Sequence, residues 1–214
     1  FQMSFSRHST HRLLLIRHGI SEGSVQGLFF GKTDTILLPE GKEQVIEASS
    51  KVSRWLNKFP SLKLYTSPLR RATSTLEILI KSLKLNNENL SSEVIHEFSE
   101  LNFGEWEGES SSSLLEKYPK SFPEHCKNIV TSSPPGGESL SELSKRVCPA
   151  LFDILSSANG QTIVIVSHLA VNRIILCRIL GIPLSNFFFI SQDNASLNVI
   201  DFDREVPHVR LING

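Results

Sequence analysis

The sequence predicts an α/β fold, a three-layer α/β/α sandwich in which helices cover both sides of a mostly parallel sheet with one antiparallel edge strand. Two observations lead to this prediction. Short apolar runs that end at charged or turn-forming residues alternate with longer stretches whose apolar side chains recur at helical spacing. Parallel strands need helical crossovers of this kind. The chain has 214 residues, and we expect residues 1–214 to form a single domain.

Six segments are expected to be strands. The clearest are Leu13–Arg17 and Thr162–Ser167, which are largely apolar and are each followed directly by a histidine. A continuous apolar run of this length indicates a buried strand. The other expected strands are Leu62–Thr66, Val94–His96, Ser196–Phe202 and Val209–Ile212.

Four longer segments are expected to be helices, because their apolar residues recur every three or four positions. Pro39 suits the first turn of a helix, where its missing N–H would have no partner in any case. Gly181 and Pro183 follow the last of these segments and are typical of a helix end. The expected helices are Pro39–Leu56, Leu69–Leu83, Glu138–Leu155 and Ala170–Leu180.

One stretch departs from this alternation. Between Glu109 and Gly137 the apolar periodicity weakens, and prolines interrupt it repeatedly. Because proline ends helices and is excluded from central strands, we expect residues 109–137 to leave the main sheet. The sequence therefore predicts a small helical excursion there, which we interpret as a lid.

Charge and composition exclude several classes of function. Lysine plus arginine and aspartate plus glutamate both number 22, so the formal net charge is zero. Such a chain has no general basic field for nucleic acid. Its longest apolar runs are far short of the roughly 20 residues that a membrane span needs. We therefore expect neither nucleic acid nor a membrane as a partner.

Cysteine usage favours a reducing compartment. Cys126, Cys148 and Cys177 form no CxxC pair, and an odd number argues against a secreted disulfide framework. We therefore expect a cytoplasmic protein. The residues Phe1 and Gln2 are interpreted as additions before a native start at Met3, and an organellar transit peptide removed upstream is left open.

Charged residues follow four of the expected strands. Arg17–Gly19 comes after the first strand, and Arg70–Arg71 opens the helix after the second. Glu100 follows the short third strand, and His168 follows the fourth. Ligands of such sheets bind beyond the carboxyl ends of the strands, so we expect these side chains to meet. Arginine forks match phosphate oxygens, and a neutral imidazole can attack phosphorus, so the set favours phosphoryl transfer.

Six segments, in this order along the chain, resemble the motifs of the histidine phosphatase superfamily, also called the phosphoglycerate mutase-like family. The resemblance covers nearly all of the chain, from Leu13 to Phe202. The third of these segments resembles the one that carries the family's second phosphate-binding arginine. Its register places that arginine at Arg71, with Arg70 as a neighbour. The six segments are LLLIRHGISEGS (Leu13–Ser24), GLFFGKTD (Gly27–Asp34), YTSPLRRATST (Tyr65–Thr75), SELNFGEWEG (Ser99–Gly108), PPGGESLSEL (Pro134–Leu143) and VIVSHLAVNRIIL (Val164–Leu176).

This resemblance implies a two-step mechanism that needs neither a metal nor a cofactor. His18 would attack a phosphomonoester and become phosphohistidine, while Glu100 protonates the leaving alcohol and later activates water. Arg17, Arg71 and His168 would hold the transferring oxygens.

Three places depart from the family pattern, and one of them is Ile20-Ser21, where the family usually has an acidic residue followed by a hydroxyl residue. The other two are expected at the substrate. Ser24 stands where the family usually has asparagine, and Leu169 stands where it usually has glycine after the second histidine. Both are expected to contact the substrate. Phe30 and Gly31 belong to the segment that resembles the family's phosphate loop, and they are also expected in the substrate pocket.

Three functions remain open on the sequence. The leading hypothesis is a phosphatase of a small phosphorylated metabolite. A cofactor-dependent phosphoglycerate mutase is the alternative, although the excursion contains Lys117, Lys120 and Lys127 and none of the paired arginines typical of mutases. The third is a weakened phospho-ligand-binding module, which Ser24 and Leu169 favour. An apolar edge strand could also pair two protomers, so a homodimer is left open.

Overall fold

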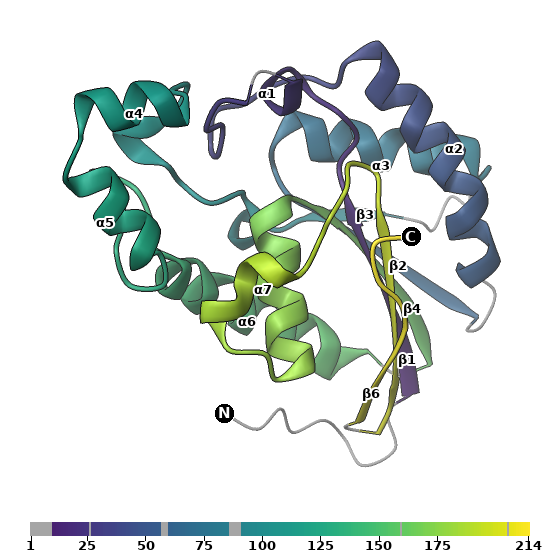
Figure 1. Ribbon diagram of the computed structural model, residues 1–214. Helices are drawn as coiled ribbons and strands as arrows, with labels where there is room; N and C mark the ends of the chain where they lie inside the picture. Colours follow the sequence, from purple (N-terminus) through teal and green to yellow (C-terminus); the bar gives the residue numbers. More distant parts are fainter. Residues whose placement is uncertain (1–9, 26, 57–59, 86–90, 159, 205) are drawn as a thin grey trace.

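The computed structural model describes residues 10–25, 27–56, 60–85, 91–158, 160–204 and 206–214, so the expected start at Phe1 to Met3 lies outside the described residues. Six strands form one sheet in the order β3-β2-β4-β1-β5-β6, with helices on both faces (Figure 1). The strands are β1 (Thr10–Arg17), β2 (Ser61–Thr66), β3 (Ser92–Val94), β4 (Gln161–Ser167), β5 (Leu197–Asp203) and β6 (Val206–Leu211).

The centre of the sheet explains why β1 is so apolar. It pairs in parallel with β4 and antiparallel with β5, so no edge of it meets solvent. Leu13 and Leu15 point into the core on one face, and Leu14 and Ile16 into the core on the other. All four are at most 1% exposed. Each such side chain stabilises the fold by about 1.5–3 kcal/mol relative to an exposed position.

Two pairs of helices cover the two faces. The helices α2 (Pro39–Leu56) and α3 (Arg70–Ser82) pack on the face of Leu14, and α6 (Leu140–Ser157) and α7 (Leu169–Leu180) pack on the face of Leu13. Figure 1 shows the resulting three layers. The predicted α/β/α architecture is therefore confirmed.

The sheet is parallel from β3 through β1 and ends in an antiparallel hairpin, β5 and β6. The predicted antiparallel edge is confirmed, with β6 as its outermost strand. The third predicted strand, Val94–His96, is wrong by two residues, because β3 ends at Val94 and His96–Phe98 form a 3₁₀ helix. All three residues of β3 are exposed, so apolar content does not mark its position. A homodimer through either edge stays a prediction.

Local signals fix several helix ends. Ser139 and Glu142 form a capping box, which starts α6 at Leu140, two residues later than the periodicity alone indicated. Gly181 ends α7 with a φ of 67°, in the left-handed region that favours glycine, as expected. Two short elements were not expected from the sequence, α1 (Glu22–Val25) and the 3₁₀ helix Leu184–Phe189.

The excursion between residues 109 and 137 is helical and lies off the sheet (Figure 1). It contains α4 (Ser111–Lys117) and α5 (Ser121–Lys127), preceded by the 3₁₀ helix Gly104–Trp106. Trp106, Leu114 and Phe122 form a small core of their own there. That this segment acts as a lid stays a prediction. Among the described helices, none is long and apolar enough to cross a membrane.

Candidate active site

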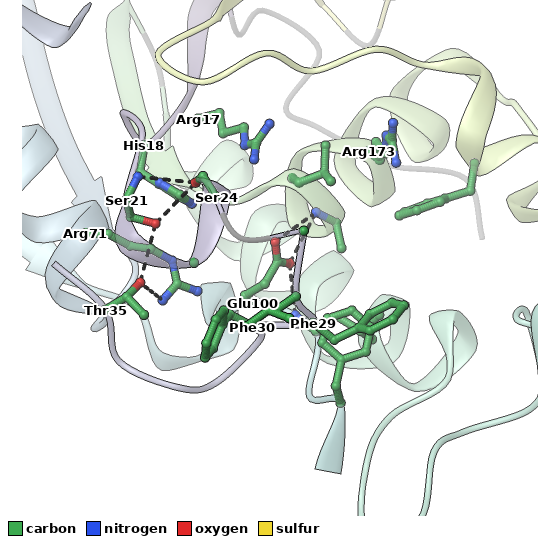
Figure 2. Close-up of a pocket in the computed structure, with 18 of the residues that line it drawn as sticks. Arg17, His18, Ser21, Ser24, Phe29, Phe30, Thr35, Arg71, Glu100 and Arg173 are labelled. Atoms are coloured by element: carbon green, nitrogen blue, oxygen red, sulfur yellow. Dashed lines mark hydrogen bonds between the residues drawn. The ribbon is translucent and has the colours of Figure 1, made fainter. Parts of the chain in front are cut away.

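A cavity of about 350 Å³ opens at the carboxyl ends of the parallel strands, where the sequence places its charged residues (Figure 2). Seven of the nine predicted site residues line it, and His168 and Gly31 lie outside the lining. The lining comprises Arg17, His18, Ser21, Gly23, Ser24, Gly27, Leu28, Phe29, Phe30, Thr35, Arg71, Glu100, Leu101, Phe103, Ile129, Leu169, Ala170, Arg173, Phe187 and Phe188.

His18 follows β1 directly and is 4% exposed. Its Nδ1 lies 2.7 Å from the carbonyl oxygen of Gly19. Because a carbonyl only accepts, Nδ1 carries the proton and Nε2 keeps its lone pair. Burial, and then the charges of Arg71 and Arg17, lower the pKa of His18 well below its ordinary 6.5. The imidazole is therefore neutral at physiological pH, which is the form that a nucleophile requires.

Gly19 itself is needed for packing. A Cβ at Gly19 would collide with the carbonyl oxygen of Gly41 at the start of α2, and Gly19 is not part of the cavity lining. Gly19 therefore allows the close contact between the turn after β1 and α2.

His168 lies beside His18, behind the cavity lining. The two ring centroids are 5.1 Å apart, and Nε2 of His168 is 2.7 Å from the hydroxyl oxygen of Ser67. Burial, and then nearby positive charge led by Arg71, lowers its pKa well below 6.5. Its Nδ1 is buried and has no hydrogen-bond partner among the described residues. A neutral ring with that nitrogen protonated could donate to an oxygen bound next to His18.

Arg17 ends β1 and reaches the same place. Its Nη1 donates to the carbonyl oxygen of Gln192 at 2.6 Å, which fixes the direction of the guanidinium. Its Nε is buried and, within the described part of the chain, has no hydrogen-bond partner. A buried donor of this kind is costly to leave unpaired. An anion in the cavity would satisfy it.

Arg70 and Arg71 lie in different environments. Arg71 is 2% exposed, and its guanidinium donates to the carbonyl oxygens of Gly31 at 2.7 Å and Thr33 at 2.9 Å. Arg70 is exposed, and its backbone amide donates to Asp34. Arg71 therefore lines the cavity and Arg70 does not, in agreement with the register of the sequence motif.

Glu107 forms hydrogen bonds to the loop whose carbonyl oxygens bind Arg71. Its carboxylate accepts hydrogen bonds from the backbone amides of residues 31–33 and of Phe103, and from the hydroxyl of Thr33 at 2.6 Å. Gly31 accordingly belongs to this scaffold, since its amide faces Glu107 and its carbonyl faces Arg71. The sequence had placed Gly31 in the substrate pocket.

Glu100 is 7% exposed and lies at the start of α7. Both its carboxylate oxygens accept from the backbone amide of Ala170 at 3.2 Å, an arrangement that the helix dipole favours. Arg146 on α6 holds the segment from behind, donating to the carbonyl of Glu100 and pairing with Glu138 at 2.7 Å. Figure 2 shows Glu100 in the same cavity as Arg17, Arg71 and Arg173.

The residues that depart from the family pattern also line the cavity. Ser24 lies 3.2 Å from Ser21, oxygen to oxygen, and accepts from the side-chain amide of Asn194 at 3.4 Å. Asn194 also donates to the carbonyl of His18. An amide from the segment before β5 therefore stands beside the serine that replaces the family's asparagine. Leu169 lines the cavity with its half-buried side chain.

Sequence reasoning missed part of the lining. Ser21 and Thr35 complete a chain of hydroxyls that leads to Arg71. Ser21 lies within the motif Leu13–Ser24 and Thr35 directly follows the motif Gly27–Asp34, but neither was predicted to line the site. Arg173 follows His168 by five residues, within a segment that the sequence had already singled out. Of the phenylalanines, only Phe30 was expected to contact substrate, but several others also line the cavity: Phe29, Phe103, Phe187 and Phe188.

Three kinds of side chain define the class of the site. They are two buried neutral histidines, arginines whose N–H groups are unpaired or could turn to a ligand, and one buried carboxylate. Such a set has the chemistry that suits a phosphoryl group and its transfer. The described residues contain no cluster of three or more His, Cys, Asp or Glu side chains placed to hold a metal ion. The fold and the site thus place the chain among α/β enzymes that act on phosphoryl groups.

Comparison with known proteins gives the family. The model of the histidine phosphatase superfamily (branch 1) matches residues 13–214. Phosphoserine phosphatase 1 of Hydrogenobacter thermophilus is 33% identical over 204 residues, which are 94% of this chain and 92% of that protein. The adenosylcobalamin/alpha-ribazole phosphatase of Escherichia coli is 26% identical over 202 residues, covering 94% and 95% of the two chains.

A solved structure agrees with these relatives. The alpha-ribazole phosphatase from Shigella flexneri superposes with a TM-score of 0.82 at 26% identity, over 95% of this chain and 96% of that one. The chain therefore belongs to the histidine phosphatase superfamily. Within it, the protein is a phosphatase of the phosphoric monoester hydrolase class.

Proposed function

We propose that this phosphatase hydrolyses a small phosphorylated metabolite in two steps, through a phosphohistidine on His18. The observation that carries the proposal is the hydrogen bond from Nδ1 of His18 to the carbonyl of Gly19. It directs the lone pair of Nε2 away from the backbone, in a cavity that Arg17 and Arg71 also line.

In the first step, Nε2 of His18 attacks phosphorus and the bond from phosphorus to the alcohol oxygen breaks. The leaving oxygen takes a proton from Glu100. The ring gains positive charge as the new bond forms, and the Gly19 carbonyl stabilises that charge through Nδ1–H.

In the second step, water attacks phosphorus and the bond to Nε2 breaks. Glu100, now a carboxylate, takes a proton from the water, and inorganic phosphate leaves. Arg17, Arg71 and His168 hold the phosphoryl oxygens throughout. Arg17 and His168 each have a buried donor with no partner among the described residues, and Arg71 lines the same cavity, which supports these roles. The steps involve no metal ion.

The structure favours hydrolysis over a mutase reaction. A mutase must retain a doubly phosphorylated intermediate and needs further cations for it. The lysines of the excursion, Lys117, Lys120 and Lys127, are exposed and none lines the cavity. Lys117 instead pairs with Glu109 at 2.6 Å. The cavity volume of about 350 Å³ supports a small substrate.

The test compares the wild type with His18→Ala in the presence of a metal chelator. The substrates are p-nitrophenyl phosphate, phosphoserine, 3-phosphoglycerate and small sugar phosphates, with released phosphate and isomerised product both measured. We expect phosphate release that the chelator does not affect and that His18→Ala abolishes. The control is His96→Ala, because His96 is exposed and lies outside the cavity lining.

Labelled substrate identifies the intermediate. Quenched wild-type protein should carry label that survives alkali and is lost in acid, as expected for a phosphorus–nitrogen bond, and His18→Ala should carry none. Isomerisation without release would assign the chain to the mutase reaction. Binding of phosphate ligands without turnover would favour the binding module.

A further inference from the structure

Arg173 is a third arginine of the cavity, and the proposed chemistry does not use it. It lies on α7 and is half-buried. Its Nε donates to the carbonyl oxygen of Ile190 at 2.7 Å. Its guanidinium lies over the rings of Phe187 and Phe188, 5.1 and 5.7 Å from their centroids. These contacts fix the plane of the guanidinium in the cavity wall.

The charge of Arg173 is not matched by a close anion. Among the described residues it forms no ion pair, and its two terminal nitrogens donate no hydrogen bond to the protein. Burial lowers the pKa of Arg173, while the charge of Glu100 opposes that effect. A half-buried cation without a close partner carries a desolvation cost that a bound anion would offset.

The phosphoryl group does not need Arg173. Its oxygens already have donors in Arg17, Arg71 and His168. Figure 2 shows Arg173 apart from His18 and Arg71, and its guanidinium lies over Phe187 and Phe188, so we assign the alcohol part of a substrate to this side of the cavity. Apart from the charged residues, much of the described cavity lining is apolar, including Leu28, Leu101, Ile129, Phe187 and Phe188.

We propose that Arg173 forms a second anion subsite, which binds a carboxylate on the alcohol part of the substrate. This inference rests on the proposed phosphatase reaction and names the class of its substrate, a phosphomonoester of a hydroxy acid. The planar fork of arginine matches a carboxylate with two parallel hydrogen bonds. The two phenylalanines lie against the guanidinium and hold the fork in place.

Charge balance supports a carboxylate as the occupant. A dianionic phosphoryl group offsets Arg17 and Arg71, and Glu100 is uncharged when it holds the proton for the leaving group. One positive charge, that of Arg173, then remains in the cavity. A single carboxylate offsets it, whereas a second phosphoryl dianion would leave an excess of negative charge.

The test uses two pairs of monoesters that differ in the carboxylate. Phosphoserine is compared with phosphoethanolamine, and 3-phosphoglycerate with glycerol 3-phosphate. We expect the wild type to have the higher kcat/KM for the carboxylated member of each pair. In Arg173→Gln, kcat/KM for that member should fall about 30-fold, the loss typical of one charge-assisted pair. For the member without a carboxylate it should change less than about threefold.

Two further variants make the result specific. Arg178→Gln removes an arginine from the same helix that does not line the cavity, and it should leave both members of each pair unaffected. Arg173→Lys keeps the charge without the fork, and it should recover part of the preference. Turnover of phosphoethanolamine by Arg173→Gln shows in the same assay that the variant is folded.

If Arg173→Gln lowered kcat/KM equally for both members of a pair, the proposed subsite would be wrong, and Arg173 would instead contact the phosphoryl group. Unchanged kinetics would overturn it as well. If the wild type released phosphate from none of the monoesters, the proposed reaction would fail. Calorimetry of phosphoserine and phosphoethanolamine binding would then still test the proposed subsite. The proposal requires that the wild type binds phosphoserine more tightly than phosphoethanolamine, and that Arg173→Gln removes this difference in affinity.

Discussion

Glu107 offers the sharpest test of how the scaffold controls the site. Its carboxylate accepts from the amides of residues 31–33 and of Phe103, and from the Thr33 hydroxyl. The carbonyls of this same loop receive the guanidinium of Arg71. Glu107 is not part of the cavity lining, so we expect it to act on substrate mainly through the position of Arg71, which makes it a positioning residue.

The perturbation is Glu107→Gln, which keeps the shape of the side chain. An amide has one accepting oxygen, and its NH₂ group would face backbone N–H groups that are themselves donors. Hydrogen bonds to a charged acceptor contribute about 1.5–3 kcal/mol each. The loop is partly exposed, so water replaces some of them, and we expect a net loss of about 2–4 kcal/mol in the free energy of unfolding.

Activity should fall as well, because a loosened loop no longer holds the fork of Arg71. We expect kcat/KM to fall about 10- to 100-fold, the effect of displacing one transition-state donor. The control is Glu105→Gln, two residues away in the chain, because Glu105 is exposed and outside the cavity lining. Urea unfolding measures the stability and steady-state kinetics measure kcat and KM.

A double-mutant cycle with Arg71→Met separates positioning from general destabilisation. If Glu107 acts through Arg71, the second substitution adds little to the loss in kcat/KM already caused by Arg71→Met. Additive losses in the cycle would refute the reasoning. So would a Glu107→Gln variant with wild-type kcat/KM and reduced stability.

Three other predictions follow from the site. Arg71→Met should lower kcat/KM by about 100- to 1,000-fold and Arg70→Met by less than about twofold, measured side by side with p-nitrophenyl phosphate. Since burial and the arginines lower the pKa of His18, its protonation should reduce kcat/KM only well below pH 6.5, and an acid limb centred at or above pH 6.5 would contradict this. Burial lowers the pKa of His11 to about 4, so the unfolded chain binds more protons between that pH and 6.5. His11 should therefore destabilise the fold as pH falls through this range, and His11→Gln should flatten the pH dependence of urea unfolding.

The order of the elements could be predicted from the sequence, because it depends on local signals. The run Leu13–Arg17 is apolar at every position that faces a core, so it could only be a buried strand. Gly181 ends α7 in the left-handed conformation that glycine adopts readily, and this preference depends only on residues nearby in the chain. β3 was misplaced because it is exposed and contributes only three pairs to the ladder.

Most of the candidate site could be predicted for the same reason. Arg17, His18, Glu100 and His168 follow strands or short connections directly, and the parallel sheet brings such positions to one edge. Gly31 was assigned to the substrate because its motif is close to the phosphate loop. Its contacts with Arg71 and Glu107 lie far away in the chain, and no local pattern encodes them.

The sequence by itself determined the alternation of strands and helices and the residues that would meet at the strand ends. Only the tertiary structure decided the proton position on His18, the anchoring of Arg71 by Glu107 and the place of Arg173 over two phenylalanines. The physical reason is the range of the interactions. Periodicity and turn residues act over a few positions, whereas Glu107 meets Gly31 across 76 residues, and the packing of whole elements determines that contact.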